Sequence, residues 1–161
     1  MELLIVRHAS AVPSGTPGIP DDERPLTPKG EERFAEAAGG LAALLRCPDA
    51  ILTSPLPRAR RTAEIAAKAW GTSAVVDTPA LATGRFEELA KALSRFSGDA
   101  LVALFGHEPH VSSLLGRLIG CSGDVLPFKK GAAALVELPG PLADGGSLLW
   151  FLPPRVLRDL A

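Results

Sequence analysis

Histidine and arginine side chains follow several apolar segments of this chain. Arg7 and His8 come directly after the run ELLIV, and His107 comes directly after ALVALFG. Arg58 lies shortly beyond a third run, AILTS, and Arg24 lies near the end of a long polar segment. Arginine stays charged and its planar fork matches phosphate, while neutral imidazole is a nucleophile near pH 7. Together these residue types indicate an anion site that contains a nucleophile.

Each of these side chains, like the nearby Arg61 and His110, also has an ordinary structural explanation when it is taken alone. Arg24 can pair with the adjacent acidic residues 21–23. Arg61 can pair with Glu64 three residues later on the same helix. His110 is expected to be exposed near the start of a helix. A functional explanation is favoured because four of the candidates each follow an apolar run of the chain: Arg7, His8, Arg58 and His107.

The periodicity of the chain predicts the elements that carry these residues. Short apolar runs predict buried strands at 2–6, 50–54 and 100–106, and a weaker strand at 74–76. Apolar residues at three- and four-residue spacing predict helices within 26–46, 57–70, 85–96 and 109–120. Thr27 is the expected N-cap of the first helix and Pro28 its first residue. Near the end, AAALVEL and SLLWFL flank a turn-rich segment, which predicts an antiparallel hairpin.

Alternating strands and helices predict the fold class α/β, as a three-layer α/β/α sandwich. We expect a mostly parallel central sheet with one antiparallel strand, and a single domain over residues 1–161. In such sheets, ligand sites form outside the carboxyl ends of the strands. Arg7, His8, Arg58 and His107 should therefore meet at one edge of the sheet, with Arg24 brought there by its loop.

The composition excludes several classes of protein. Apolar residues make up 47% of the 161 residues and charged residues 22%, which is typical of a folded globular chain. The net charge of -1 argues against nucleic acid or an anionic membrane as the main partner, because both need a basic surface. No apolar run approaches the roughly 20 residues of a membrane helix. Without a signal-peptide pattern, and with Cys47 and Cys121 expected as free thiols, the predicted localisation is cytoplasmic.

Four short motifs resemble those of the histidine phosphatase superfamily, also called phosphoglycerate-mutase-like. They are RHA at 7–9, RPLTPKG at 24–30, SPLPRARRTAE at 54–64 and GHEP at 106–109. Each motif is weak alone, but their order and spacing match the family over nearly the whole chain. The small size and the RPLT loop look most like the SixA-type phosphohistidine phosphatases. The resemblance implies the phosphoglycerate-mutase-like fold.

The resemblance also implies a role for each candidate residue. His8 corresponds to the nucleophile that accepts the phosphate, and Arg7, Arg58 and His107 to the residues that hold the phosphoryl oxygens. Arg24 corresponds to a further phosphate-binding arginine. No cofactor or metal is implied, and the chain offers no cluster of carboxylate and histidine ligands. Arginines are physically suited to this chemistry, since phosphoryl transfer depends on positioning and on stabilising negative charge.

The identity of the substrate depends on the leaving group. An alcohol leaves as a poor alkoxide and benefits from a general acid, which relatives acting on phosphomonoesters supply after the third strand. Here Ala82 or Thr83 occupies that place, and Glu87 and Glu88 lie on the expected polar face of a helix. An imidazole, with a pKa of about 6.5, leaves protonated without such help. We therefore expect a phosphatase that acts on phosphohistidine in a protein, with a role in signal transduction.

Two alternatives stay open at this point. The first is a phosphatase of small phosphomonoesters, such as sugar or nucleotide phosphates, in which Glu87 or Glu88 acts as the acid. The second is a non-catalytic regulatory domain that binds phosphate. The presence of His8 argues against the second alternative, because a binding domain needs the arginines but no nucleophile.

Overall fold

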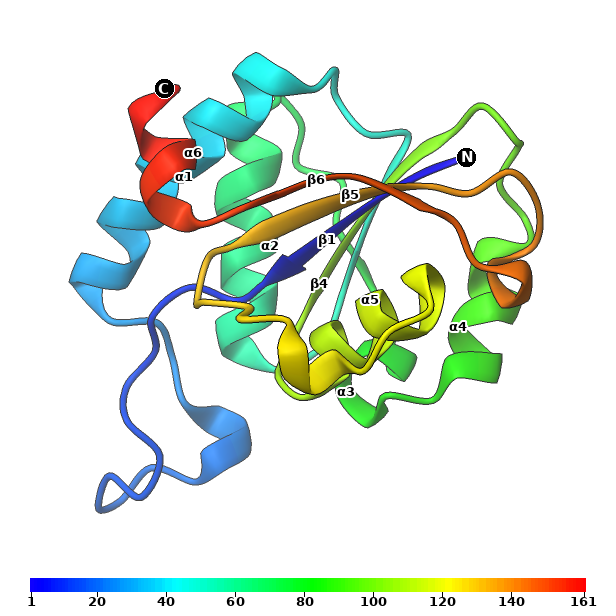
Figure 1. Ribbon diagram of the computed structural model, residues 1–161. Helices are drawn as coiled ribbons and strands as arrows, with labels where there is room; N and C mark the ends of the chain where they lie inside the picture. Colours follow the sequence, from blue (N-terminus) through cyan, green and yellow to red (C-terminus); the bar gives the residue numbers. More distant parts are fainter.

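Six strands form one mixed sheet in the computed structural model, which describes residues 1–161 (Figure 1). The strands are β1 (Glu2–Arg7), β2 (Ala50–Thr53), β3 (Val76–Asp77), β4 (Leu101–Gly106), β5 (Ala133–Glu137) and β6 (Ser147–Leu152). Their order across the sheet is β3-β2-β4-β1-β5-β6. Only β5 runs antiparallel to its two neighbours, and all other pairs are parallel. The prediction of a mostly parallel sheet with one antiparallel strand is confirmed.

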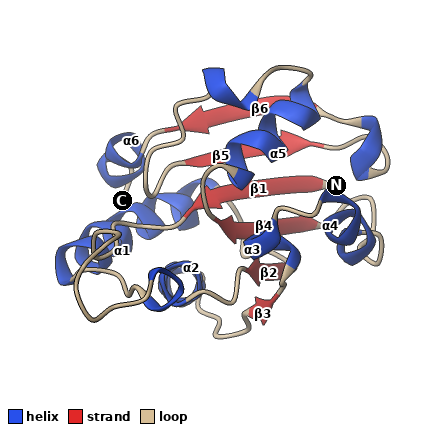
Figure 2. Cartoon of the chain, turned by 90° about the horizontal axis from the view of Figure 1, so that it is seen from below, coloured by secondary structure: helices blue, strands red, loops and turns tan.

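Helices cover both faces of the sheet (Figure 2). One face carries α1 (Pro28–Leu44), α2 (Pro57–Ala69) and α6 (Pro154–Asp159), and the other carries α3 (Ala80–Thr83), α4 (Phe86–Leu93) and α5 (His110–Ile119). Three short 3-10 helices lie in the connections, at Asp21–Glu23, Gly123–Val125 and Leu142–Asp144. The three-layer α/β/α sandwich is therefore confirmed. No helix has the length and apolar character needed to cross a membrane.

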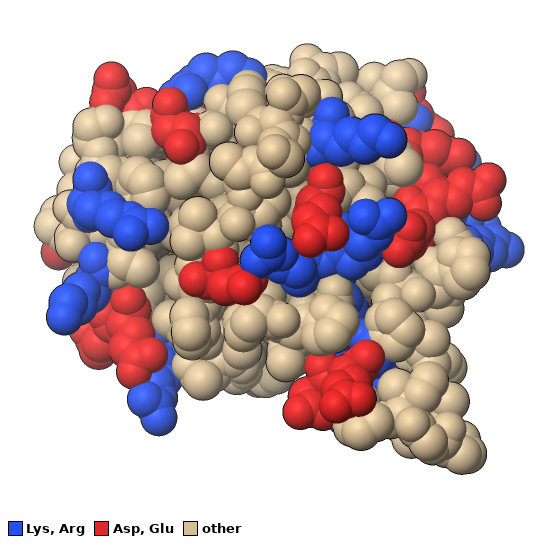
Figure 3. All heavy atoms as spheres, turned by 180° about the vertical axis from the view of Figure 1, so that it is seen from behind, with Lys and Arg blue, Asp and Glu red and all other residues tan.

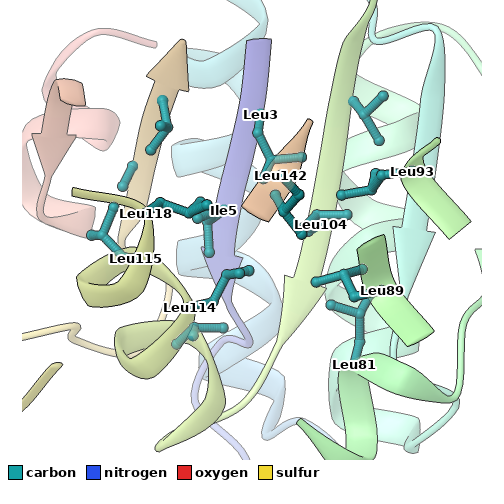
Figure 4. Close-up of a cluster of buried hydrophobic side chains, with 14 of the residues drawn as sticks. Leu3, Ile5, Leu81, Leu89, Leu93, Leu104, Leu114, Leu115, Leu118 and Leu142 are labelled. Atoms are coloured by element: carbon teal, nitrogen blue, oxygen red, sulfur yellow. The ribbon is translucent and has the colours of Figure 1, made fainter. Parts of the chain in front are cut away.

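The central strand β1 shows why the continuous apolar runs become buried strands. Leu3 and Ile5 point into the core on the side of α4 and α5, where Leu104 and Leu114 also pack (Figure 4). The alternate residues, which point into the core beside α1 and α2, are Leu4 and Val6. These four residues of the six in β1 are 0% exposed, and each such burial stabilises the fold by about 1.5–3 kcal/mol. The sheet centre is thus a rigid support for the residues that follow β1 and β4.

The ends of the elements match the expected start and stop signals, with small differences. Thr27 caps α1 by accepting a hydrogen bond from the Gly30 amide at 3.0 Å, and Pro28 is the first helical residue. The weak strand expected at 74–76 lies instead at Val76–Asp77, because only these residues pair with the end of β2. The short helix α3 was not expected, since four residues are too few to show a helical period.

The expectation that His110 is exposed was wrong. The side chain is half-buried at the start of α5, and its ring lies against Gly84. Gly84 has φ +70°, and a Cβ at that position would overlap the ring. Glycine at the end of α3 therefore both permits the left-handed turn and leaves space for the imidazole.

Candidate active site

The two middle strands bring the two candidate histidines together. β1 and β4 pair in parallel with Arg7 opposite Gly106, so that His8 and His107 follow at the same edge of the sheet. Their ring centroids are 5.1 Å apart, and each residue is only 5% exposed. Arg58 comes from the first turn of α2, directly after the adjacent strand β2, and is 6% exposed. The structure thus brings the buried residues His8, Arg58 and His107 to one edge of the sheet, together with the half-buried Arg7.

A backbone hydrogen bond orients the imidazole of His8. Its Nδ1 lies 2.7 Å from the carbonyl oxygen of Ala9. Because a carbonyl only accepts hydrogen bonds, Nδ1 carries the proton and Nε2 keeps a free lone pair. Burial lowers the pKa of His8 to about 4, and the charges of Arg58 and Arg7 act in the same direction. The imidazole is therefore neutral at pH 7, and the lone pair of Nε2 is available for a reaction.

The loop after His8 is tied to α2 by a side chain that sequence reasoning did not single out. The hydroxyl of Thr62 accepts a hydrogen bond from the Ala9 amide at 3.0 Å and donates one to the Arg58 carbonyl at 2.6 Å. Thr62 is 0% exposed. It thereby couples the position of His8 to the helix that carries Arg58. The only sequence signal for Thr62 is its place in the motif SPLPRARRTAE.

We expect Thr62→Val to lower kcat by about tenfold or more and to reduce the free energy of unfolding by about 1–3 kcal/mol. Valine has a similar shape but leaves the buried Ala9 amide without an acceptor. Thr62→Ser keeps the hydroxyl and should restore most of kcat, which steady-state kinetics and urea unfolding will check. A Thr62→Val enzyme with wild-type kcat would show that the hydroxyl does not position His8.

His107 is held by a second hydroxyl that the sequence did not reveal. Its Nε2 lies 2.7 Å from Ser54 Oγ, and that oxygen also accepts the Leu56 amide at 3.2 Å. Burial lowers the pKa of His107 to about 3, with further lowering by the charge of Arg58 and, at low pH, by protonated His8. His107 is therefore a neutral imidazole in the free protein.

Three buried nitrogen atoms at this place have no hydrogen-bond partner: Arg7 Nε, Arg58 Nε and His107 Nδ1. The other ends of the two guanidinium groups are anchored, since Arg7 Nη1 donates to the Phe128 carbonyl at 2.6 Å and Arg58 Nη1 to the Asp21 carbonyl at 2.8 Å. A buried donor without an acceptor costs about 1–3 kcal/mol. Oxyanion oxygens are strong acceptors for such nitrogens, so all three are candidate contacts for a phosphoryl group.

Arg24 forms the local ion pair that the sequence offered as its structural explanation. Its Nε pairs with Asp21 Oδ1 at 2.8 Å and its Nη1 donates to the Val12 carbonyl at 2.7 Å, so the local ion pair exists. The side chain is nevertheless only 13% exposed, and its charge lowers the pKa of Arg58. Arg24 thus lies close to Arg58, held by the loop rather than free to rearrange.

Several other charged residues near these motifs have partners elsewhere. Arg61 forms two hydrogen bonds of 2.9 Å with Glu31, and Arg60 pairs with Asp77 at 2.7 Å. Such pairs are common on the surface, where basic and acidic side chains lie side by side (Figure 3). The two possible acids on α4 are paired in the same way: Glu88 lies 2.8 Å from Arg85 and Glu87 lies 3.5 Å from Arg117.

One carboxylate close to the candidate site was not anticipated. Glu108 directly follows His107, and its charge raises the pKa of Arg7 against the lowering by burial. The carboxylate accepts a hydrogen bond from the Ser112 hydroxyl one turn into α5. Its position in GHEP was visible in the sequence, but its proximity to Arg7 depends on the turn between β4 and α5.

Comparison with known proteins agrees with the motifs. The sequence model of one protein family, the histidine phosphatase superfamily (branch 1), matches residues 3–92. An uncharacterised protein of Picosynechococcus sp. is 37% identical over 134 residues, which are 81% of either chain. A protein of Mycobacterium tuberculosis is 36% identical over 126 residues, covering 73% of this chain and 72% of the relative.

Solved structures show the same fold over almost the full length. The protein histidine phosphatase SixA in complex with tungstate superimposes with a TM-score of 0.83 and 26% identity, covering 98% of this chain and 99% of that one. The alpha-ribazole phosphatase from Shigella flexneri has a TM-score of 0.71 and 16% identity, covering 96% and 97% of the chains, so it supports the fold alone. The chain belongs to the histidine phosphatase superfamily, in its SixA-type branch.

Proposed function

We propose that this phosphatase uses His8 as its nucleophile and that its substrate is a phosphohistidine on another protein. The observation that carries the proposal is the set of three buried, unpartnered nitrogens beside a neutral His8. The SixA structure was solved in complex with tungstate, a tetrahedral oxyanion like phosphate, which supports an oxyanion as the ligand of this chain too.

In the first step, His8 Nε2 attacks phosphorus and forms a P–N bond. The bond from phosphorus to the leaving group breaks, and its electron pair goes to that group. Arg7 Nε and Arg58 Nε donate to the equatorial oxygens, where negative charge accumulates. In the second step, water attacks the phosphohistidine and the P–Nε2 bond breaks. The electron pair returns to the His8 imidazole, and the proton that phosphate does not keep passes to solvent.

His107 supplies a further donor to the phosphoryl oxygens. Ser54 Oγ already accepts the Leu56 amide, so we assign its proton to the hydrogen bond with His107 Nε2. In the neutral imidazole this leaves the proton on Nδ1, which is the nitrogen without a partner. A bound phosphate would raise the pKa of His107 and strengthen the same interaction.

The absence of a glutamate from the segment directly after the third strand favours phosphohistidine as the substrate. Ala82 and Thr83 lie in α3, where relatives acting on esters carry a glutamate. Glu87 and Glu88 are exposed and paired with arginines of α5 and of the segment before α4. An imidazole leaving group needs no acid, because its pKa is about 6.5.

The test compares three substrates without added metal: a phosphohistidine-bearing protein, an aryl phosphate and an alkyl phosphate. We expect the phosphohistidine protein to be hydrolysed fastest and the alkyl phosphate to be slower than it by about 100-fold or more, since an alkoxide leaving group lacks its acid. His8→Ala should be inactive with all three. Fastest turnover of the alkyl phosphate would indicate that the substrates are small phosphomonoesters. Glu108 would then be the first residue to examine as the general acid. Phosphate binding without turnover would favour the non-catalytic alternative.

A further inference from the structure

A cavity of about 100 Å³ adjoins the loop that follows His8. Ala9 and Ser10 of that loop form part of its wall. The first two turns of α1 form another part, where Gly30 allows close packing because a Cβ there would overlap the Ser10 carbonyl oxygen. The cavity therefore lies next to the residue that we propose to carry out the reaction, yet it contains none of the three unpartnered nitrogens.

Three cationic side chains from separate segments line this cavity: Arg33 of α1, Lys130 before β5 and Arg158 of α6. Arg33 and Lys130 form no ion pair, and Arg158 has only a carboxylate oxygen of Glu36 at 3.6 Å. The charge of Lys130 also lowers the pKa of His8, which places Lys130 within electrostatic reach of the nucleophile. The cavity thus carries a local excess of positive charge in a chain whose net charge is -1.

The size and lining of the cavity indicate what kind of anion fits. A cavity of about 150 Å³ accepts a benzene ring, so one of 100 Å³ suits a smaller group. Phe34, Ala37 and Pro154 provide apolar contacts beside the cations. A carboxylate on a short methylene stem combines both properties, since its oxygens accept charge-assisted hydrogen bonds and its stem packs on apolar surface.

We propose that this cavity binds an aspartate or glutamate side chain of the phosphorylated protein, close to the phosphohistidine that His8 attacks. The inference rests on the proposed function. Two contacts, one at the phosphoryl group and one at the carboxylate, fix the orientation of the substrate as well as its affinity. Because the carboxylate takes no part in the reaction, it acts on KM and leaves kcat unchanged.

The experiment uses two phosphohistidine peptides that differ only at the flanking positions, with Asp and Glu in one and the isosteric Asn and Gln in the other. We expect the wild type to have an about fivefold higher kcat/KM for the acidic peptide than for the amide peptide, because its KM for the acidic peptide is lower. High salt should reduce this preference. Arg33→Gln should lose most of this preference. Arg33 is exposed and unpaired, so the substitution leaves the fold intact. The matched control is Lys68→Gln, which removes one exposed charge from α2, outside the cavity, and should retain the preference.

Equal kcat/KM for the two peptides with the wild type would overturn the inference, and so would a preference that Arg33→Gln leaves unchanged. Failure of the proposed function gives a different result, namely no turnover of either peptide while an aryl phosphate is hydrolysed. In that case the unphosphorylated peptides are tested as inhibitors of aryl phosphate hydrolysis. Stronger inhibition by the acidic peptide, lost in Arg33→Gln, supports the cavity as a carboxylate site, and equal inhibition overturns it.

Discussion

Replacing His8 by alanine is expected to lower kcat by about 10⁴-fold or more, because the phosphoryl group then has no nucleophile to accept it. The variant keeps the arginines and His107 that we propose as phosphate contacts, so binding of inorganic phosphate should persist. Steady-state hydrolysis of a phosphohistidine protein measures the first effect, and the shift of the thermal unfolding midpoint with added phosphate measures the second.

The burial of His8 determines the control for this experiment. The side chain is only 5% exposed and packs near His107, so alanine leaves a small cavity. His8→Asn fills more of that space and can still donate to the Ala9 carbonyl, but it cannot accept a phosphoryl group as imidazole does. Both variants should fold and both should be inactive. A folded His8→Asn protein with substantial kcat would show that another residue is the nucleophile.

Arg58→Ala is expected to lower kcat/KM by about 100- to 1,000-fold, since it removes a buried cation that we propose to face the developing charge. Its Nε is one of the three unpartnered buried nitrogens. The matched variant Arg61→Ala lies three residues later on the same helix and loses only surface contacts, with Glu31 and with Glu64. That change should alter kcat/KM by less than about threefold.

Kinetics and unfolding should be measured for both arginine variants. Arg58 also contacts the loop at Asp21, so its loss can loosen the segment that holds Arg24. Arg58→Lys keeps a charge without the planar fork and is expected to restore only part of the activity. Equal losses in Arg58→Ala and Arg61→Ala would mean that the phosphate lies against a different face of α2.

The sequence was sufficient to predict the layers of the fold and the edge at which the candidate residues meet. The runs at 2–6 and 100–106 are apolar at every inward position, so both had to be buried strands, and parallel pairing places His8 and His107 together. The weaker elements were harder to locate. β3 has two exposed residues and depends on pairing with β2, while α3 is one turn long. Neither has enough residues for a periodic pattern.

The details of the site that sequence could not predict are contacts between residues distant in the chain. Thr62 meets Ala9 across 53 positions, and Ser54 meets His107 across the same number. These bonds depend on the packing of α2 against the strand ends, which no local pattern encodes. The deep burial of His8 is likewise a product of the assembled layers, because its neighbours in sequence include polar and exposed residues.

The most direct test of the central claim is to look for the phosphoryl group on the protein during turnover. The wild type is mixed with a labelled substrate, quenched within milliseconds in alkali, where phosphohistidine is stable, and digested for mass spectrometry. We predict a phosphorylated peptide containing His8, with label on that side chain, which forms and decays at rates consistent with kcat. It should be absent from His8→Asn. Label on another residue, or turnover with no phosphorylated peptide at any time, would contradict the assignment of His8 as the nucleophile.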